Sequence, residues 1–135
     1  MPQTSDQFDV FTQECPSRRV LDLIADKWTA LVLHALAQGT MRHHELLHRI
    51  EGISQKMLIQ TLRNLERNGM VERRVYPEVP PRVEYQLTSL GVSLQQTVSR
   101  LCDWAMAHLH EVKEAQERYQ SEHSKEPQPI SSSRA

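Results

Sequence analysis

The fold is decided by residues 53–69, whose sequence is ISQKMLIQTLRNLERNG. Ser54 is a suitable N-cap, because its hydroxyl can accept a hydrogen bond from a free N–H group of the first helical turn. Gly69 suits the position after the last turn, because glycine adopts a left-handed conformation without a Cβ clash. The stretch therefore predicts a helix with a defined start and a defined end.

Helical spacing divides this stretch into two faces. At about 100° per residue, one side gathers the residues expected to be buried, which are Met57, Leu58, Thr61, Leu62 and Leu65. The opposite side gathers Lys56, Gln60, Arg63 and Arg67, flanked by Ile59 and Asn64. Cations neutralise phosphates, amides read base edges and an apolar group can contact a thymine methyl, so this face suits a DNA major groove. The alternative is an ordinary amphipathic helix with a solvated polar face.

Three shorter helices are expected before residue 53. The first begins at Pro16, because proline is favoured at the first helical position, and ends near residue 25. The second runs from about 27 to 38 and stops before Gly39, and the third spans 42–50. A turn at residues 51–52 then leads into the helix described above. Two helices joined by a short turn that contains glycine predict a helix-turn-helix.

After Gly69 the hydrophobic period changes from 3.6 to 2, as it does in strands. Residues 70–76 and 82–87 alternate as two strands, and the prolines between them exclude a helix. A helix-turn-helix followed by a two-stranded ribbon is a winged helix. The predicted fold class is thus mostly α with a small β-ribbon, with additional N- and C-terminal dimerisation helices. Arg74 and Arg82 fall at the tip end of the ribbon, where they can meet a phosphate backbone or a minor groove.

A last helix is expected over about 89–118, capped by Thr88. Its apolar residues step by three or four from Leu90 to Val112, and a small domain cannot cover so long a stripe, so a second subunit is expected to do so. The expected interface residues are Leu94, Val98, Leu101, Trp104, Ala105 and Leu109. The expected organisation is a flexible arm over 1–14, a winged-helix domain with its dimerisation helix over 15–120, and a disordered tail over 121–135.

The composition fits one globular domain. The chain has 135 residues, of which 39% are hydrophobic and 24% charged, with a net charge of −1. Residues 40–85 carry eight Lys/Arg and six Asp/Glu, so positive charge is only mildly concentrated there. No apolar run approaches the ~18 residues of a membrane span, and the N-terminus does not resemble a signal peptide. Two distant cysteines do not form a disulfide scaffold, so a cytoplasmic protein is expected.

Several segments, in order along the chain, resemble one family of regulators. They are Cys15-Pro16, Leu21–Ile24, Lys27-Trp28, and the ranges 52–58, 75–85 and 88–91. Together they look like the HxlR-type winged-helix transcriptional regulators, which are related in fold to the MarR group. The resemblance covers about residues 14–112 and implies a dimeric bacterial DNA-binding regulator. The sequence departs from the family at Ala25-Asp26, where many members have two glycines, and at Met41-Arg42, where a contact to the DNA backbone can be lost.

The resemblance also implies a sensing role for one cysteine. Several HxlR-type regulators sense oxidants or electrophiles through a cysteine just before the first helix, and Cys15 matches that position. The helix N-terminus and nearby Arg18 and Arg19 favour a thiolate there, whereas Glu14 opposes it. One alternative is a structural Cys15 packed at the dimer interface, as burial is expected for Cys102 on the apolar stripe. Others are control by a small ligand between the winged domain and the dimer helices, and a protein-interaction module that does not contact DNA.

The predicted DNA-binding residues lie on the helix of residues 54–69 and on the ribbon. Base edges or nearby phosphates are assigned to Gln55, Lys56, Gln60 and Asn64, and phosphate or minor-groove contacts to Arg63, Arg67 and Arg82. Ser54 and Arg74 complete the set. A homodimer places two such helices about one DNA turn apart, ~34 Å, and binds an inverted repeat. Repression is expected, because a small dimer acts most simply by blocking access to DNA.

Enzymatic function has no support in the sequence. No glycine-rich phosphate loop, nucleophile elbow or pair of spaced carboxylates is present, so no catalytic residue and no cofactor are expected. His44 and His48 lie four residues apart on a predicted helix, but neither Glu45 nor Glu51 is well placed to complete a metal site. These histidines and His43 are expected to face solvent or phosphate.

Overall fold

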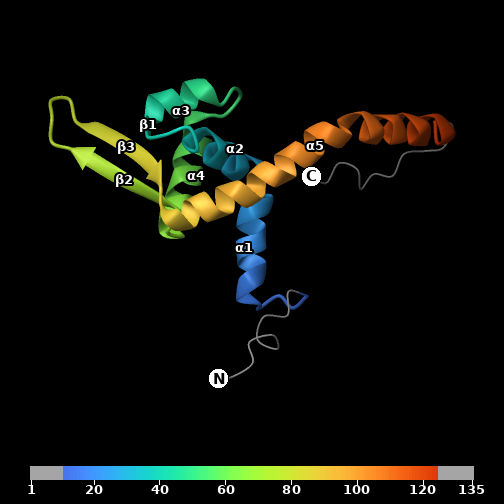
Figure 1. Cartoon of the computed structure of the whole chain (residues 1–135), viewed down its shortest axis with the longest axis horizontal. Coiled ribbons are helices and arrows are strands. Elements are labelled where there is room, and N and C mark those ends of the chain that lie inside the picture. Colours follow the sequence, from blue (N-terminus) through green and yellow to red (C-terminus); the bar gives the residue numbers. More distant parts are fainter. Residues whose placement is uncertain (1–10, 125–135) are drawn as a thin grey trace. The chain divides into compact units, whose positions relative to one another are not determined.

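The structure is a computed structural model, and it describes residues 11–124 of the chain. Its elements, in order, are α1 (Pro16–Ala25), α2 (Lys27–Leu36), β1 (Met41–Arg42), α3 (His43–Arg49), α4 (Gln55–Arg67), β2 (Val71–Tyr76), β3 (Arg82–Leu87) and α5 (Ser89–Glu122) (Figure 1). The chain divides into two compact units, Met1–Ser99 and Arg100–Ala135. Most of the predicted arm and tail lies outside the described residues.

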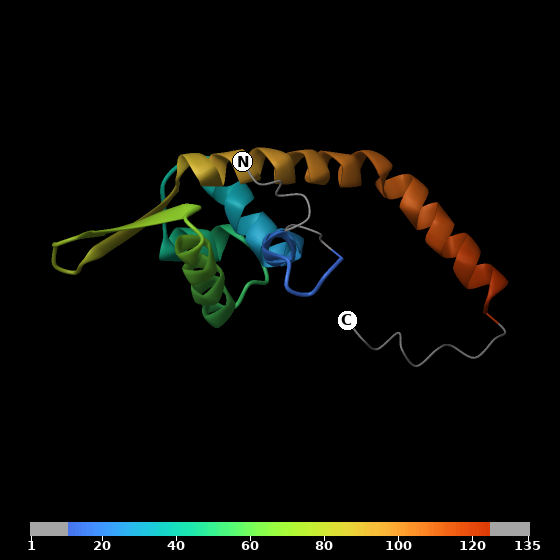
Figure 2. The same cartoon turned by 90° about the horizontal axis from the view of Figure 1, so that it is seen from below.

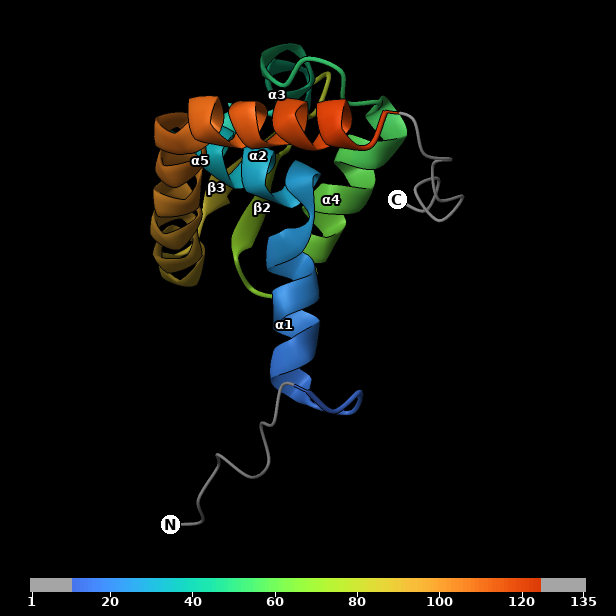
Figure 3. The same cartoon turned by 90° about the vertical axis from the view of Figure 1, so that its right-hand side faces the viewer.

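The first unit has a winged-helix fold, as predicted. Helices α2, α3 and α4 surround a core whose fully buried side chains include Val32, Leu33, Leu46, Leu58, Leu62 and Leu65. Strands β2 and β3 form a ribbon that extends beyond these helices (Figure 2). Figure 3 shows α1 extending away from α2, α3 and α4, and α1 has no buried residue.

Both predicted ends of α4 are confirmed. The Ser54 hydroxyl accepts a hydrogen bond from the Met57 backbone N–H at 3.0 Å. Gly69 has a φ of +76°, and its N–H donates to the Glu66 carbonyl at 3.1 Å. Local sequence is enough to set this helix, because each end is fixed by a residue within one turn of it.

The sheet has one strand more than the sequence predicted. Its order is β1-β3-β2, with both pairs antiparallel, and Met41 and Arg42 pair with Tyr85 and Glu84. Residue 42 was expected to be helical, but it belongs to β1, and α3 begins one residue later. A strand of two residues has almost no periodicity of its own, so it exists only because β3 offers a free edge.

The base of the ribbon is joined to α4 and α5 through Thr88. Its hydroxyl donates to the Gly69 carbonyl at 2.6 Å and accepts from the Gly91 N–H at 3.1 Å, so Thr88 is the expected cap of α5. Its own N–H donates to the Met70 carbonyl at 3.1 Å. Gly91 is buried against this point, and a Cβ there would overlap the Met70 carbonyl oxygen.

Helix α5 continues to Glu122, beyond the expected end near residue 118 and into the predicted tail. Tyr119 stacks on His123 with ring centroids 4.0 Å apart, and this i,i+4 contact supports the additional turn. None of the helices within residues 11–124 combines the length and the apolar character needed to cross a bilayer.

Candidate nucleic-acid interface

Helix α4 presents the two faces that its spacing predicts. Leu58, Thr61, Leu62 and Leu65 are buried, whereas Met57, also expected to be buried, is half-buried. The opposite side exposes the side chains of Gln55, Lys56, Ile59, Gln60, Arg63 and Arg67. Asn64 is half-buried, and its side-chain oxygen accepts a hydrogen bond from Arg67 Nη1 at 3.1 Å. The exposed side is therefore rigidly mounted, because the leucines beneath it fix the rotation of the helix.

A tight turn positions α4 relative to α3. The Ile53 N–H donates to the Ile50 carbonyl at 3.3 Å, and both isoleucine side chains are buried. Gly52 has a φ of +91°, a conformation that side-chain-bearing residues rarely adopt. The α3–turn–α4 segment is thus a helix-turn-helix in which the second helix carries the exposed cations.

The register of the ribbon gives it two different faces. Residues directly opposite each other share a face, so Arg73 and Tyr85 lie on one side, and Arg74 and Glu84 on the other. On the second side, Glu72 Oε1 accepts a hydrogen bond from Gln86 Nε2 at 3.0 Å. The same oxygen lies 3.8 Å from Arg74 Nη2. This second face is largely neutralised by its own carboxylates.

Arg82 is more constrained than the sequence indicated. Its guanidinium lies 3.1 Å from a carboxylate oxygen of Glu78, 3.7 Å from one of Glu84, and 4.1 Å from the centre of the Tyr76 ring. Only 30% of its side chain is exposed. In this conformation Arg82 stabilises the tip of the ribbon, and contact with DNA would require it to exchange a carboxylate for a phosphate.

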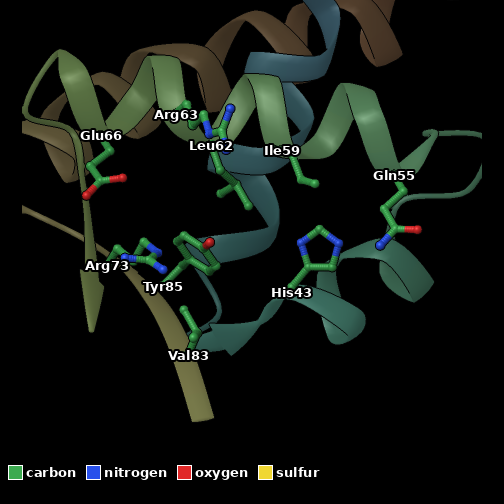
Figure 4. A pocket seen from close by; sticks show the side chains of 9 residues that line it. All are labelled: His43, Gln55, Ile59, Leu62, Arg63, Glu66, Arg73, Val83 and Tyr85. Carbon is green, nitrogen blue, oxygen red and sulfur yellow. The ribbon is translucent and has the colours of Figure 1, made fainter. Parts of the chain in front are cut away.

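A cleft of about 580 Å³ separates α4 from the first face of the ribbon (Figure 4). Its lining residues are His43, Gln55, Ile59, Leu62, Arg63, Glu66, Arg73, Val83 and Tyr85. Of these, Gln55 and Arg63 were predicted from the sequence as DNA-binding residues, whereas Arg73 was not singled out. The two-residue period of β2 carried a signal for Arg73, but only the pairing with β3 tells which of two adjacent arginines faces α4.

His43 differs from the expectation of a histidine facing solvent or phosphate. Its Nε2 atom is buried and has no hydrogen-bond partner among the described residues. His43 is the first residue of α3, next to β1, so its position depends on the strand that the sequence did not reveal. Within residues 11–124, no group of three or more His, Cys, Asp or Glu side chains is arranged to hold a metal ion.

The C-terminal unit exposes an apolar stripe along α5. Leu101 is 58% exposed, Trp104 59% and Leu109 56%, with Met106, Val112 and Tyr119 also exposed. Ala105 is exposed as well, whereas Leu94 is half-buried. Val98, which like Leu94 belongs to the first unit, is only 2% exposed and so offers a partner almost no surface. In the same unit, α1 exposes Val20 and Leu21.

Cys15 lies at the N-cap of α1 and is 2% exposed. Its carbonyl accepts a hydrogen bond from the Arg18 N–H at 3.1 Å, while the Arg18 guanidinium is directed to the Phe11 carbonyl at 3.4 Å. Cys102 on α5 is half-buried, and both cysteines are free thiols. The thiol of Cys15 is therefore covered by its surroundings.

Comparison with known proteins agrees with this geometry. Residues 23–113 match the family model described as HxlR-like helix-turn-helix. The chain is 45% identical over 104 residues to the uncharacterized HTH-type transcriptional regulator YtfH of Escherichia coli, covering 77% of this chain and 82% of that protein. The structure of the putative transcriptional regulator ytfH from Salmonella typhimurium has a TM-score of 0.75 and 43% identity, and the match covers 79% of this chain and 96% of that one. The structure of the redox regulator HypR in its reduced form has a TM-score of 0.68 and 34% identity, and the match covers 73% of this chain and 98% of that one. The oxidized form of HypR is also similar.

Proposed function

The chain belongs to the HxlR-like helix-turn-helix family of transcriptional regulators, and from this premise we propose that it is a dimeric, sequence-specific repressor whose Cys15 responds to oxidants or electrophiles. Membership in this family makes it a DNA-binding protein and not a member of an enzyme family. The observation that carries the proposal is the exposed cationic face of α4, fixed from beneath by buried leucines.

Helix α4 enters the major groove in this proposal. Gln55, Lys56, Gln60 and Asn64 then lie near base edges, with Arg63 and Arg67 at phosphates. The Ser54 hydroxyl accepts the cap bond of α4 and keeps its proton, so it can donate to a phosphate. On the wing, Arg74 and Arg82 contact the backbone or minor groove after leaving their carboxylate partners.

Dimerisation through α5 supplies the second reading helix. The exposed stripe of Leu101, Trp104 and Leu109 supports this, because apolar side chains that are more than half exposed gain free energy when a partner covers them. Two-fold symmetry then places two α4 helices about one DNA turn apart, ~34 Å, and selects an inverted repeat. A bound dimer blocks the DNA it covers, which makes repression the simplest mode of action.

The sensing role of Cys15 is supported by its position at the N-terminus of α1 and by the likeness to HypR, a redox regulator solved in reduced and oxidized forms. Because Cys15 is 2% exposed, an oxidant reaches its thiol only when the residues that cover it move. Modification then prevents those residues from returning, and the altered position of α1 changes the spacing of the two α4 helices.

A mobility-shift experiment tests both parts of the proposal. Reduced protein is mixed with DNA from upstream of its own gene and its neighbours, and the mixture is treated with diamide and then with dithiothreitol. We expect retarded DNA that diamide releases and dithiothreitol restores, and a Cys15→Ser variant that retards DNA but ignores diamide. Cys102→Ser is the matched control and should respond as wild type does.

The outcomes separate the two parts. Retardation that diamide does not affect removes the thiol switch and keeps the regulator. A Cys15→Ser variant that still releases DNA with diamide also excludes Cys15 as the sensor. Failure to retard any fragment at low salt contradicts the DNA-binding proposal and favours a protein-interaction module.

A further inference from the structure

The cleft between α4 and the ribbon has the dimensions of a small-molecule site. Its volume of about 580 Å³ lies within the range of roughly 300–1,000 Å³ that is usual for ligand pockets. All of its lining residues belong to the first unit, from α3 through β3. Figure 4 shows His43 and Tyr85 standing beneath α4, with Arg73 and Glu66 at one end of the cleft and Gln55 at the other.

The charges of the cleft favour an anion. Arg63 from α4 and Arg73 from β2 line it, and within the described residues neither makes an ion pair or a side-chain hydrogen bond. Glu66 is the single acidic residue in the lining. A planar guanidinium binds a carboxylate through two parallel hydrogen bonds, which makes a carboxylate a suitable partner for either arginine.

The remaining walls favour an apolar body attached to that anion. Ile59 and Leu62 form the α4 side, and Val83 and Tyr85 form the β3 side. A DNA phosphate would use the arginines but would leave this apolar lining without a partner. An organic acid covers both kinds of surface, as ligands do in pockets that combine apolar walls with a few polar groups.

Two polar atoms in the lining also lack partners. His43 Nε2 is buried without a hydrogen bond, and the Tyr85 hydroxyl makes none within residues 11–124. A buried polar atom such as His43 Nε2 costs free energy while it is unpaired, and a ligand oxygen can recover that cost. In the tautomer protonated at Nε2, His43 donates to such an oxygen.

We propose that this cleft binds a small organic carboxylate with an apolar body, and that this ligand and DNA exclude each other. The exclusion rests on the proposed DNA-binding function, because Gln55 and Arg63 serve both the cleft and the reading face of α4. A ligand that occupies Arg63 removes a cation from the DNA contact and fills the space beside α4. The site is distinct from Cys15, so it gives the regulator a second input.

Binding is tested by NMR titration of the isotope-labelled full chain with three probes. Phenylacetate has both the charge and the apolar body, phenylacetamide lacks the charge, and acetate lacks the body. We expect phenylacetate to shift the guanidinium signals of Arg63 and Arg73 saturably, with an affinity about tenfold or more above that of either control. Phenylacetamide lacks the charge-assisted hydrogen bond, and acetate lacks the apolar surface that the ring buries. The Arg73→Gln variant should lose about tenfold in affinity for phenylacetate.

Arg49→Gln is the matched control, because it removes the same charge from α3 outside the cleft, where Arg49 lines a separate hollow with Leu31 and His34. Equal losses in Arg49→Gln and Arg73→Gln would show a general charge effect and overturn the site. Acetate binding as tightly as phenylacetate would also overturn it, because the cleft would then be a plain anion site suited to a DNA phosphate.

A mobility shift with and without phenylacetate separates this inference from the proposed function. Retarded DNA that phenylacetate releases from wild type, but much less readily from Arg73→Gln, supports both. If the protein retards DNA but phenylacetate causes no change in its NMR signals, the inference is overturned and the proposed function stands. Phenylacetate binding in a protein that retards no DNA supports the site and contradicts the DNA-binding proposal.

Discussion

Arg73 lies directly opposite Tyr85 in the β2–β3 ladder, so the two side chains stand on the face of the ribbon that lines the cleft below α4. The next residue, Arg74, lies opposite Glu84 on the other face, near Glu72. Two adjacent arginines thus have different electrostatic surroundings. Arg73 is unpaired beside α4, and Arg74 is partly neutralised.

Arg63→Ala should weaken binding to every DNA sequence and reduce the slope of log affinity against log salt. If a dimer contacts ~6–8 phosphates, the slope is about −5 to −7, and the loss of one contact per subunit reduces its magnitude by about 2. The measurement is fluorescence anisotropy at several salt concentrations, with Arg49→Ala as the control. An unchanged slope would remove Arg63 from the phosphate contacts.

Arg82→Ala should lower the stability of the fold more than Arg73→Ala does. Its guanidinium contacts Glu78, Glu84 and the Tyr76 ring, so its loss should lower the free energy of unfolding by about 1 kcal/mol. Arg73→Ala removes an exposed, unpaired side chain and should change it by less than about 0.5 kcal/mol. Urea unfolding of both variants measures the difference, and equal midpoints would show that the contacts of Arg82 contribute nothing.

Asp26→Ala should destabilise the start of α2. The Asp26 carboxylate accepts hydrogen bonds from the backbone N–H groups of Trp28 at 2.8 Å and Thr29 at 3.3 Å. Loss of such a cap costs about 1 kcal/mol, whereas Asp26→Ser keeps an acceptor and should retain most of the stability. Thermal unfolding of the two variants makes the comparison. Equal losses of stability in Asp26→Ala and Asp26→Ser would argue against capping as the role of Asp26.

Gly91→Ala should be severely destabilising although alanine favours helices. The added Cβ would overlap the Met70 carbonyl oxygen, which is backbone and cannot move alone. Overpacking of this kind costs about 3 kcal/mol or more, which exceeds the gain of about 1 kcal/mol in helix propensity. Ser93→Ala on the exposed side of the same helix is the control. An unfolding midpoint equal to wild type would show that α5 shifts freely at this point.

Leu109→Glu should convert the proposed dimer into a monomer. Leu109 is 56% exposed in the single chain, so the substitution costs the monomer little, whereas a charge buried in an interface is unfavourable. Sedimentation velocity gives the mass of each species, and Gln116→Glu, which adds the same charge to another exposed position of α5, is the control. A variant that stays dimeric would place the interface elsewhere.

The sequence was sufficient wherever structure is set by near neighbours. Ser54 and Gly69 act within one turn of α4, and the leucine spacing needs only the helical period, so this helix and its exposed face were predicted correctly. The proline at the start of α1 was equally informative.

Features that depend on distant pairing were not predictable in the same way. Strand β1 exists through its pairing with β3, more than forty residues along the chain, and it also positions His43. The same dependence hid the cleft, because the register of β2 on β3 decides whether Arg73 or Arg74 faces α4. Ala25 and Asp26 stand where many members of the family have two glycines, and the sequence alone did not reveal Asp26 as the cap of α2.

The hydrogen bonds of Thr88 join Gly69, just after the end of α4, to the base of the ribbon and the first turn of α5. A change in the direction of that first turn cannot leave α4 in place without breaking one of these bonds or forcing Gly91 against Met70. In the proposed dimer, subunit association through α5 and operator recognition through α4 are therefore coupled. By thermodynamic reciprocity, the factor by which dimerisation changes the affinity for DNA equals the factor by which bound DNA changes the dimerisation constant.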